Sequence, residues 1–186
     1  MADVSVRPAR GTDAAQLAEV QMACWLDAYA GVLPGPALAA IASSSHALAE
    51  RWRVSAQDPP SSRHRVLVAC AEERVVGGTA LAPAQDEDLD SERDAELLVL
   101  LVAPGERRAG HASRLLSASV DHLRGDGFGR AVLWVDRSDP GLPALLASSG
   151  WAPDGVARNL DLEGDAAVVV QQLRWHTDLT HEEEQP

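Results

Sequence analysis

Hydrophobic positions recur along this chain with two different periods, which divide it into short segments. Apolar and polar residues alternate where a strand is expected, and apolar residues recur every three or four positions where a helix is expected. In chain order, the pattern predicts a strand at 4–9, helices at 12–29 and from Pro36 to about Ala56, a hairpin at 64–82, a strand at 95–103, a helix from Gly110 to about 125, a strand at 130–136, a short helix at 140–150, and strands at 151–162 and 165–176.

Three local patterns add detail to this outline. Asp13 and Gln16 have the spacing of a capping box at the start of the first helix. Residues 95–103 are apolar at successive positions, which predicts a central strand covered on both faces. Residues 83–94 form an acidic loop, for which we favour a solvated connector over a rim that attracts cations.

The order of the elements indicates an α/β (α+β) fold with a mixed, mostly antiparallel sheet flanked by helices. A strand–helix–strand crossover lies at its centre, formed by residues 95–136. The chain of 186 residues favours one domain, which we assign to residues 1–176. We expect residues 177–186 to form a mobile acidic tail.

Charge and composition narrow the function. The net charge of −12 disfavours nucleic acid as a partner and favours a cationic one, and all 16 basic residues are arginine. No apolar run approaches the roughly 20 residues of a membrane span, and the N-terminus lacks the features of a signal peptide, so we expect a cytoplasmic protein without a membrane partner. Cys24 and Cys70 lie in apolar surroundings and are expected to be buried thiols, and no Cys/His cluster has the spacing of a metal site.

The turn after the apolar strand concentrates positive charge in this acidic chain. Arg107, Arg108 and Arg114 surround Gly110 at the start of a predicted helix, where unpaired N–H groups and the helix dipole favour an anion. Gly110 and Ala112 leave room for a ligand close to the backbone. The turn lacks both the GxxxxGK[ST] and the GxGxxG phosphate-binding patterns. It predicts a small ligand that carries phosphate.

The stretch "VAPGERRAGHASRLL" combines V-x-P, R-x-x-G-x-A and a Leu-Leu pair, and the N-terminal "WLDAYAGVLP" follows W-x-x-x-Y-x-G-x-L-P. These patterns resemble the acyl-coenzyme A loop and the N-terminal segment of the GNAT superfamily of N-acetyltransferases. The resemblance covers roughly Val4 to Trp175. It implies acetyl-coenzyme A as acyl donor, and the spacing of the Cys and His residues leads us to expect no metal.

The resemblance also implies a role for individual backbone groups. The strand ending at Val102 would pair with the pantetheine arm, and the N–H of Leu100 would point at the thioester carbonyl. His111 departs from the apolar residue that is usual in the family, and we expect its ring to be partly exposed. The amides that would hold the pyrophosphate belong to Arg107, Arg108, Ala109, Gly110, His111 and Ala112.

Glu96 is the candidate general base, since it lies four residues before Leu100 at the position of a catalytic glutamate in some family members. Burial among apolar neighbours and repulsion from acids such as Asp94 are expected to raise its pKa. A solvated carboxylate at the start of the strand is the alternative. Direct deprotonation of the acceptor and deprotonation through a water are both open.

The usual thiolate acid of the family is absent, because Leu146 occupies the tyrosine position four residues before Gly150-Trp151. Asp139 replaces a common asparagine near the start of the same helix. Ser148, Ser149 or a water could supply the proton, or the thiolate could leave unassisted.

The resemblance further assigns the segment around Tyr29 to the acceptor cleft, so Tyr29 is a candidate substrate-binding residue, with core packing as the alternative. Trp25, one turn earlier, is expected to pack in the core.

These observations favour an enzyme that transfers acetyl from acetyl-coenzyme A to a primary amine of a small molecule or peptide, by direct attack in a ternary complex. No residue is placed as a covalent nucleophile. A cationic acceptor suits the net charge, and a homodimer is compatible with the resemblance. The alternatives are a degenerate member that binds acyl-coenzyme A as a sensor or interaction module, and a nucleotide-binding protein.

Overall fold

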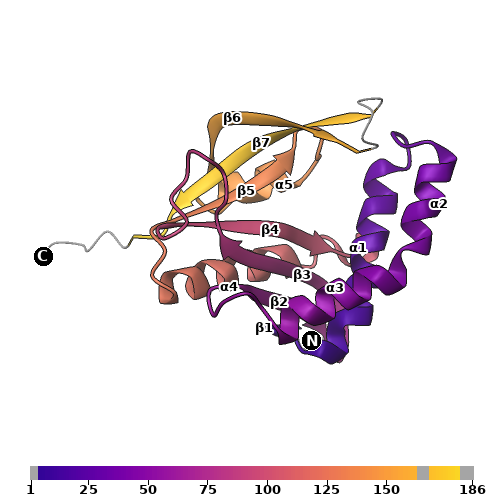
Figure 1. Cartoon of the computed structure of the whole chain (residues 1–186), viewed down its shortest axis with the longest axis horizontal. Coiled ribbons are helices and arrows are strands. Elements are labelled where there is room, and N and C mark those ends of the chain that lie inside the picture. Colours follow the sequence, from indigo (N-terminus) through magenta and orange to yellow (C-terminus); the bar gives the residue numbers. More distant parts are fainter. Residues whose placement is uncertain (1–3, 163–167, 181–186) are drawn as a thin grey trace, which may run out of the picture.

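A seven-stranded sheet in the order β1-β2-β3-β4-β5-β7-β6 organises the chain (Figure 1). The computed structural model describes residues 4–162 and 168–180. Neighbouring strands are antiparallel except β4 and β5, which are parallel. The strands are β1 (Val4–Pro8), β2 (Arg65–Ala71), β3 (Arg74–Pro83), β4 (Asp94–Val102), β5 (Arg130–Asp136), β6 (Ala152–Asp161) and β7 (Val169–Asp178).

Helices cover both faces of this sheet. Alternation along β2 places Val66 and Val68 in one apolar cluster with residues of α1 and α3, and Leu67 and Ala69 in a second cluster with residues of α4 and α5. Among the described residues, no helix is both long and apolar enough to cross a membrane. The helices are α1 (Ala14–Tyr29), α2 (Gly35–Ser43), α3 (Ser45–Gln57), α4 (His111–Gly125) and α5 (Leu142–Ser148), with short 3-10 turns at Gly11–Asp13 and Pro104–Glu106.

The expected mixed sheet with a central strand–helix–strand crossover is confirmed, because β4 and β5 are parallel and α4 connects them. The two strands pair over only four positions, from Asp94 opposite Arg130 to Leu97 opposite Leu133. Beyond Leu97, a bulge at Leu98 interrupts the register between β3 and β4. The C-terminal halves of β4 and β5 therefore do not pair with each other.

This divergence corrects the expectation that residues 95–103 are covered on both faces. Ala95 and Leu97 are fully buried, whereas Leu98 is 52% exposed and the rest of β4 is only partly covered. The end of β4 thus borders an opening in the sheet, and its apolar side chains from Val99 to Val102 are partly buried at the margins of the two apolar clusters.

Several other boundaries differ from the prediction. The second helix is two helices, α2 and α3, separated at Ser44. The predicted Asp13–Gln16 capping box does not form at the start of α1, because Asp13 binds Arg7 and accepts from the Arg10 N–H, while the Gln16 side chain accepts from the Val75 N–H. Arg7 of β1 and Val75 of β3 thus bind the two side chains in place of the cap.

The last strand extends beyond residue 176, after which we expected the C-terminal tail to begin. Residues 177 and 178 belong to β7, and Leu179 is buried and donates its N–H to the Gly129 carbonyl. The remainder of the tail, 181–186, lies outside the described residues.

The close packing of α1 against β3 at Gly78 yields a prediction about stability. A Cβ added to Gly78 would lie 2.4 Å from Cδ2 of the fully buried Leu17 of α1. Gly78→Ala should therefore lower the free energy of unfolding by about 1–3 kcal/mol through overpacking. Urea denaturation measures the loss. Gly31→Ala is the matched control, since a Cβ there meets nothing within 4 Å, and an equal effect of both substitutions would contradict the account.

Candidate functional site

An exposed turn joins the end of β4 to α4. Arg107 to Gly110 are exposed, and both Arg108 and Gly110 have positive φ, of 66° and 83°. No side chain in the described chain caps the start of α4. The N–H groups of the first helical turn, beginning at His111, are therefore available to an anion.

Two arginine side chains hold the shape of this turn. Arg107 Nη1 donates to Asp27 Oδ2 of α1 at 2.7 Å, and Arg114 Nη1 donates to the Ala109 carbonyl at 3.1 Å. The Arg107–Asp27 pair is about half exposed on both sides, so its net energy is small and its partners can exchange with a ligand. The turn is positively charged, as expected, and it is tied to α1.

The last part of β4 presents backbone groups to the opening between β4 and β5. The Ala103 N–H donates to the Val76 carbonyl of β3 at 2.9 Å. Because N–H groups alternate along a strand, those of Leu100 and Val102 face away from β3. The Val102 carbonyl accepts from the Cys24 thiol of α1 at 3.3 Å. The backbone of Leu100 and Val102 thus lines the unpaired edge of β4.

We expected the ring of His111 to be partly exposed, but the residue is only 3% exposed. Its Nδ1 has no partner among the described residues. The ring of this first helical residue turns inward beneath the turn rather than outward to solvent. Only its backbone N–H remains available at the turn.

Glu96 lies six residues before Val102, on the same sheet face as Ala82, Val132 and His176, which follow one another across β3, β5 and β7. Its side chain is half-buried. Burial raises the pKa of Glu96 most, and the Asp86 carboxylate raises it further, while Arg158 and Arg174 oppose the shift. The like charge that acts on Glu96 is therefore Asp86 of the acidic loop and not Asp94.

The acidic loop is anchored rather than being a solvated connector. Arg174 of β7 is only 2% exposed, and its guanidinium binds Asp86 and Asp88 of this loop and Asp154 of β6. Trp134 of β5 donates its Nε1–H to Asp86 Oδ2 at 3.1 Å. Sequence analysis missed this cluster and His176, because their residues lie on four separate segments whose proximity depends on the order of the strands.

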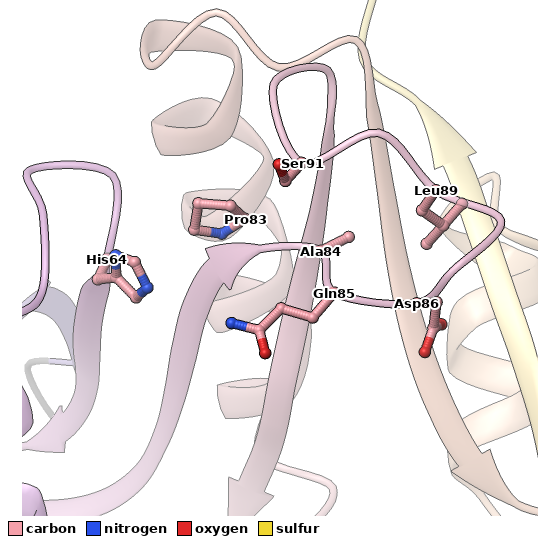
Figure 2. A pocket seen from close by; sticks show the side chains of 7 residues that line it. All are labelled: His64, Pro83, Ala84, Gln85, Asp86, Leu89 and Ser91. Carbon is pink, nitrogen blue, oxygen red and sulfur yellow. The ribbon is translucent and has the colours of Figure 1, made fainter.

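A cavity of about 410 Å³ opens at the acidic loop. Figure 2 shows the loop residues on one side of it and His64, which precedes β2, on the other. Since Pro83 pairs with Ala95, the cavity lies beyond Glu96 on the side opposite to the anion-binding turn. Its lining residues are His64, Pro83, Ala84, Gln85, Asp86, Leu89 and Ser91.

Tyr29 lies at the C-terminal end of α1, where it is half-buried. Burial raises the pKa of Tyr29, and Asp136 at the end of β5 raises it further. Cys24 of the same helix contacts Val102 at the end of β4. The helix therefore approaches both of the diverging strand ends. Trp25 packs against the α1–α3 cluster, as predicted.

The short helix α5 offers little acid–base chemistry. Leu146 is fully buried in the core. Ser148 Oγ donates to the Leu145 carbonyl at 2.8 Å, and Asp139 Oδ1 accepts from the N–H groups of Gly141 and Leu142. Asp139 therefore caps the start of this helix, and Ser149 is exposed.

Comparisons with known proteins agree with this geometry. One similar solved structure is yncA from Salmonella typhimurium with its cofactor acetyl-CoA, at 15% identity and a TM-score of 0.67, covering 99% of this chain and 98% of that chain. A second is PaiA N-acetyltransferase from Thermoplasma acidophilum in complex with coenzyme A, at 18% identity and a TM-score of 0.66, covering 91% of this chain and 98% of that chain. A third is the ribosomal-protein-S18-alanine N-acetyltransferase from Escherichia coli, at 15% identity and a TM-score of 0.63, covering 99% of both chains. A search of curated proteins found no match.

At these identities, the structural likeness shows the fold. The sequence model of the acetyltransferase (GNAT) family matches residues 24–151, which include the C-terminal end of α1, β4, the turn at 107–110 and α4. The chain therefore belongs to the acetyltransferase (GNAT) family.

Proposed function

We propose that this protein is an N-acetyltransferase that moves the acetyl group of acetyl-coenzyme A to the primary amine of a cationic small molecule or peptide. The observation that carries the proposal is the order in which three features follow one another along β4. An anion-binding turn lies after its C-terminal end, an unpaired backbone edge precedes the turn, and a half-buried glutamate of raised pKa lies further back.

The turn and the strand suit the two ends of coenzyme A. Amides from Arg107 to Ala112 would bind the pyrophosphate, because they start an uncapped helix and are surrounded by arginine. The unpaired edge of β4 at Val102 would hydrogen-bond the pantetheine arm. The N–H of Leu100 would donate to the thioester carbonyl and stabilise the oxyanion that forms there.

Glu96 would act as the base. An alkyl ammonium with a pKa of about 10 must lose a proton before its nitrogen can attack. In the proposed reaction, Glu96 takes this proton directly or through a water, and the amine nitrogen then bonds to the acetyl carbon to give a tetrahedral intermediate. The nitrogen releases a second proton to water, and the C–S bond breaks with its electron pair leaving on sulfur. The thiolate then leaves unassisted or takes a proton from water or from the exposed Ser149, because Leu146 is a buried apolar side chain and the Ser148 hydroxyl donates to the Leu145 carbonyl.

The acceptor would enter through the cavity at the acidic loop. Asp86 lines it and also acts on Glu96, so the cavity opens near the proposed base. Gln85 and Ser91 add hydrogen-bonding groups, and no arginine is among the lining residues. This chemistry suits a cationic amine better than an acidic one. Tyr29 would border the acceptor from α1.

The burial of Leu146 also supports a second candidate function, a protein that binds acyl-coenzyme A without transferring the acyl group. Release of free thiol from acetyl-coenzyme A across a panel of amines separates the two. Thermal stabilisation by coenzyme A without thiol release on any amine would favour the binding protein, and absence of coenzyme A binding would exclude both.

The anion-binding turn can be tested with an isosteric pair of variants at Gly110. Asp and Asn both tolerate the positive φ of this position, and they differ in charge. Gly110→Asp should weaken coenzyme A binding at least about tenfold relative to Gly110→Asn, or about 1.4 kcal/mol, measured by titration calorimetry. Equal affinities for the two variants would show that the pyrophosphate does not bind at this turn.

Replacement of Glu96 tests the base. Glu96→Gln should lower kcat by about 10²–10⁴-fold on a true acceptor and leave coenzyme A affinity nearly unchanged. Glu87→Gln removes an exposed glutamate of the acidic loop and serves as the control, with activity expected to stay at the wild-type level. Wild-type turnover by Glu96→Gln would remove Glu96 from the mechanism.

The raised pKa of Glu96 also predicts two effects of pH. Activity should fall as the pH decreases through this pKa, above the ordinary glutamate value of about 4.3, because the protonated form cannot act as a base. Ionisation of Glu96 costs folding free energy, so any stability gained from its protonated form is lost as the pH rises through the folded pKa. Glu96→Gln should therefore unfold at a higher temperature than wild type at pH 8, but not at pH 4.

A further inference from the structure

Arg174 carries the densest set of polar contacts in the described chain, and no step of the proposed reaction uses it. Its Nε donates to Asp154 Oδ2 at 2.7 Å, and its Nη1 donates to Asp88 Oδ1 at 2.8 Å and to Asp86 Oδ2 at 3.2 Å. Its Nη2 also binds Asp88. A buried guanidinium requires such partners, because an unpaired charge in this position would be strongly destabilising.

The surroundings of Arg174 fix it further. Trp134, which pairs with Arg174 across β5 and β7, has its ring centroid 5.6 Å from the guanidinium carbon. The guanidinium carbon of Arg158 lies 4.2 Å from the same ring. Because β7 and β5 are paired over seven positions, Arg174 is held in a fixed position in the sheet. The acidic loop, which leads into the N-terminal end of β4, is attached to this side chain.

We propose that Arg174 and Asp86 are positioning residues for Glu96. Arg174 clamps the loop between β3 and β4, so that the Asp86 carboxylate is held beside Trp134 on the sheet face that carries Glu96, where its negative charge acts on Glu96. This inference rests on the proposed role of Glu96 as the base.

Other charged groups near Glu96 act against the effect of Asp86 or lie on the same sheet face. Arg158 and Arg174 favour the ionised form of Glu96, whereas burial and Asp86 favour the protonated form. Asp88 binds the same guanidinium but is not among the groups that act on Glu96. The other titratable groups that the strand register and ion pairs place on this face include His176 and Asp178 of β7, Arg130 and Asp136 of β5, Asp94 of β4 and Asp154 of β6.

The two aspartates of the loop therefore form a matched pair for an experiment. Asp86→Asn and Asp88→Asn each remove one charge and one partner of Arg174, but only Asp86 acts on Glu96. The titration midpoint of Glu96 is read from the ¹³C NMR signal of its side-chain carboxyl, assigned by its loss in Glu96→Gln. This readout does not require an acceptor substrate.

We expect Asp86→Asn to move the Glu96 midpoint to lower pH, and Asp88→Asn and the charge-conserving Asp86→Glu to leave it in place. The acid limb of kcat/KM should move in the same direction as the midpoint. Equal shifts in both asparagine variants, or an unmoved midpoint in Asp86→Asn, would overturn the inference. A shifted midpoint together with wild-type turnover by Glu96→Gln would instead contradict only the proposed role of Glu96.

The clamp itself is tested by Arg174→Gln. Amide hydrogen exchange should become faster across residues 84–93, while exchange in α4 stays at the wild-type rate if the protein remains folded. Unchanged exchange in the loop would show that Arg174 does not hold it. A variant that fails to fold leaves the decision to the pair of aspartate variants.

Discussion

The parallel pairing of β4 and β5 is the constraint on which the site depends. A parallel pair requires a crossover connection, and here α4 provides it, so the first turn of α4 lies at the C-terminal end of β4. Since the pairing ends at Leu97, the rest of β4 keeps one backbone edge unpaired. An uncapped helix start and an open strand edge therefore come together in one short stretch of the chain. Both offer backbone groups, which allows the side chains of β4 to remain apolar.

The parts of the fold that depend on local periodicity could be predicted from the sequence. The strand–helix–strand crossover, the position of the turn around Gly110 and the packing of Trp25 all follow from residues that are close together in the chain. The loss of the Asp13–Gln16 cap could not be predicted, because the competing partners of these two side chains lie on β1 and β3. The division of the second helix at Ser44 was not predicted either. The burial of His111 likewise depends on how α4 rests against the sheet.

Prediction of the candidate site shows the same division. Glu96 could be named as a candidate base from the family resemblance, which applies to a position four residues before Leu100 on the same strand. Its electrostatic environment could not be predicted, since Asp86, Arg158 and Arg174 come from three other segments. The acidic loop resembled a solvated connector because its partners are distant in sequence, with Arg174 lying 88 residues from Asp86 and Arg63 lying 29 residues from Glu92. Buried ion pairs of this kind have no sequence period, so only the strand order reveals them.

The exclusive use of arginine as the basic side chain has a consequence for the alkaline range. Amine acceptors become nucleophilic as the pH approaches their pKa of about 10, where a lysine would begin to lose its own charge. Arginine stays protonated beyond pH 12, so the anion-binding turn and the guanidinium of Arg174 keep the same charge over that whole interval. Over the pH range in which an alkyl amine loses its proton, the positive charges of these arginine side chains therefore stay constant.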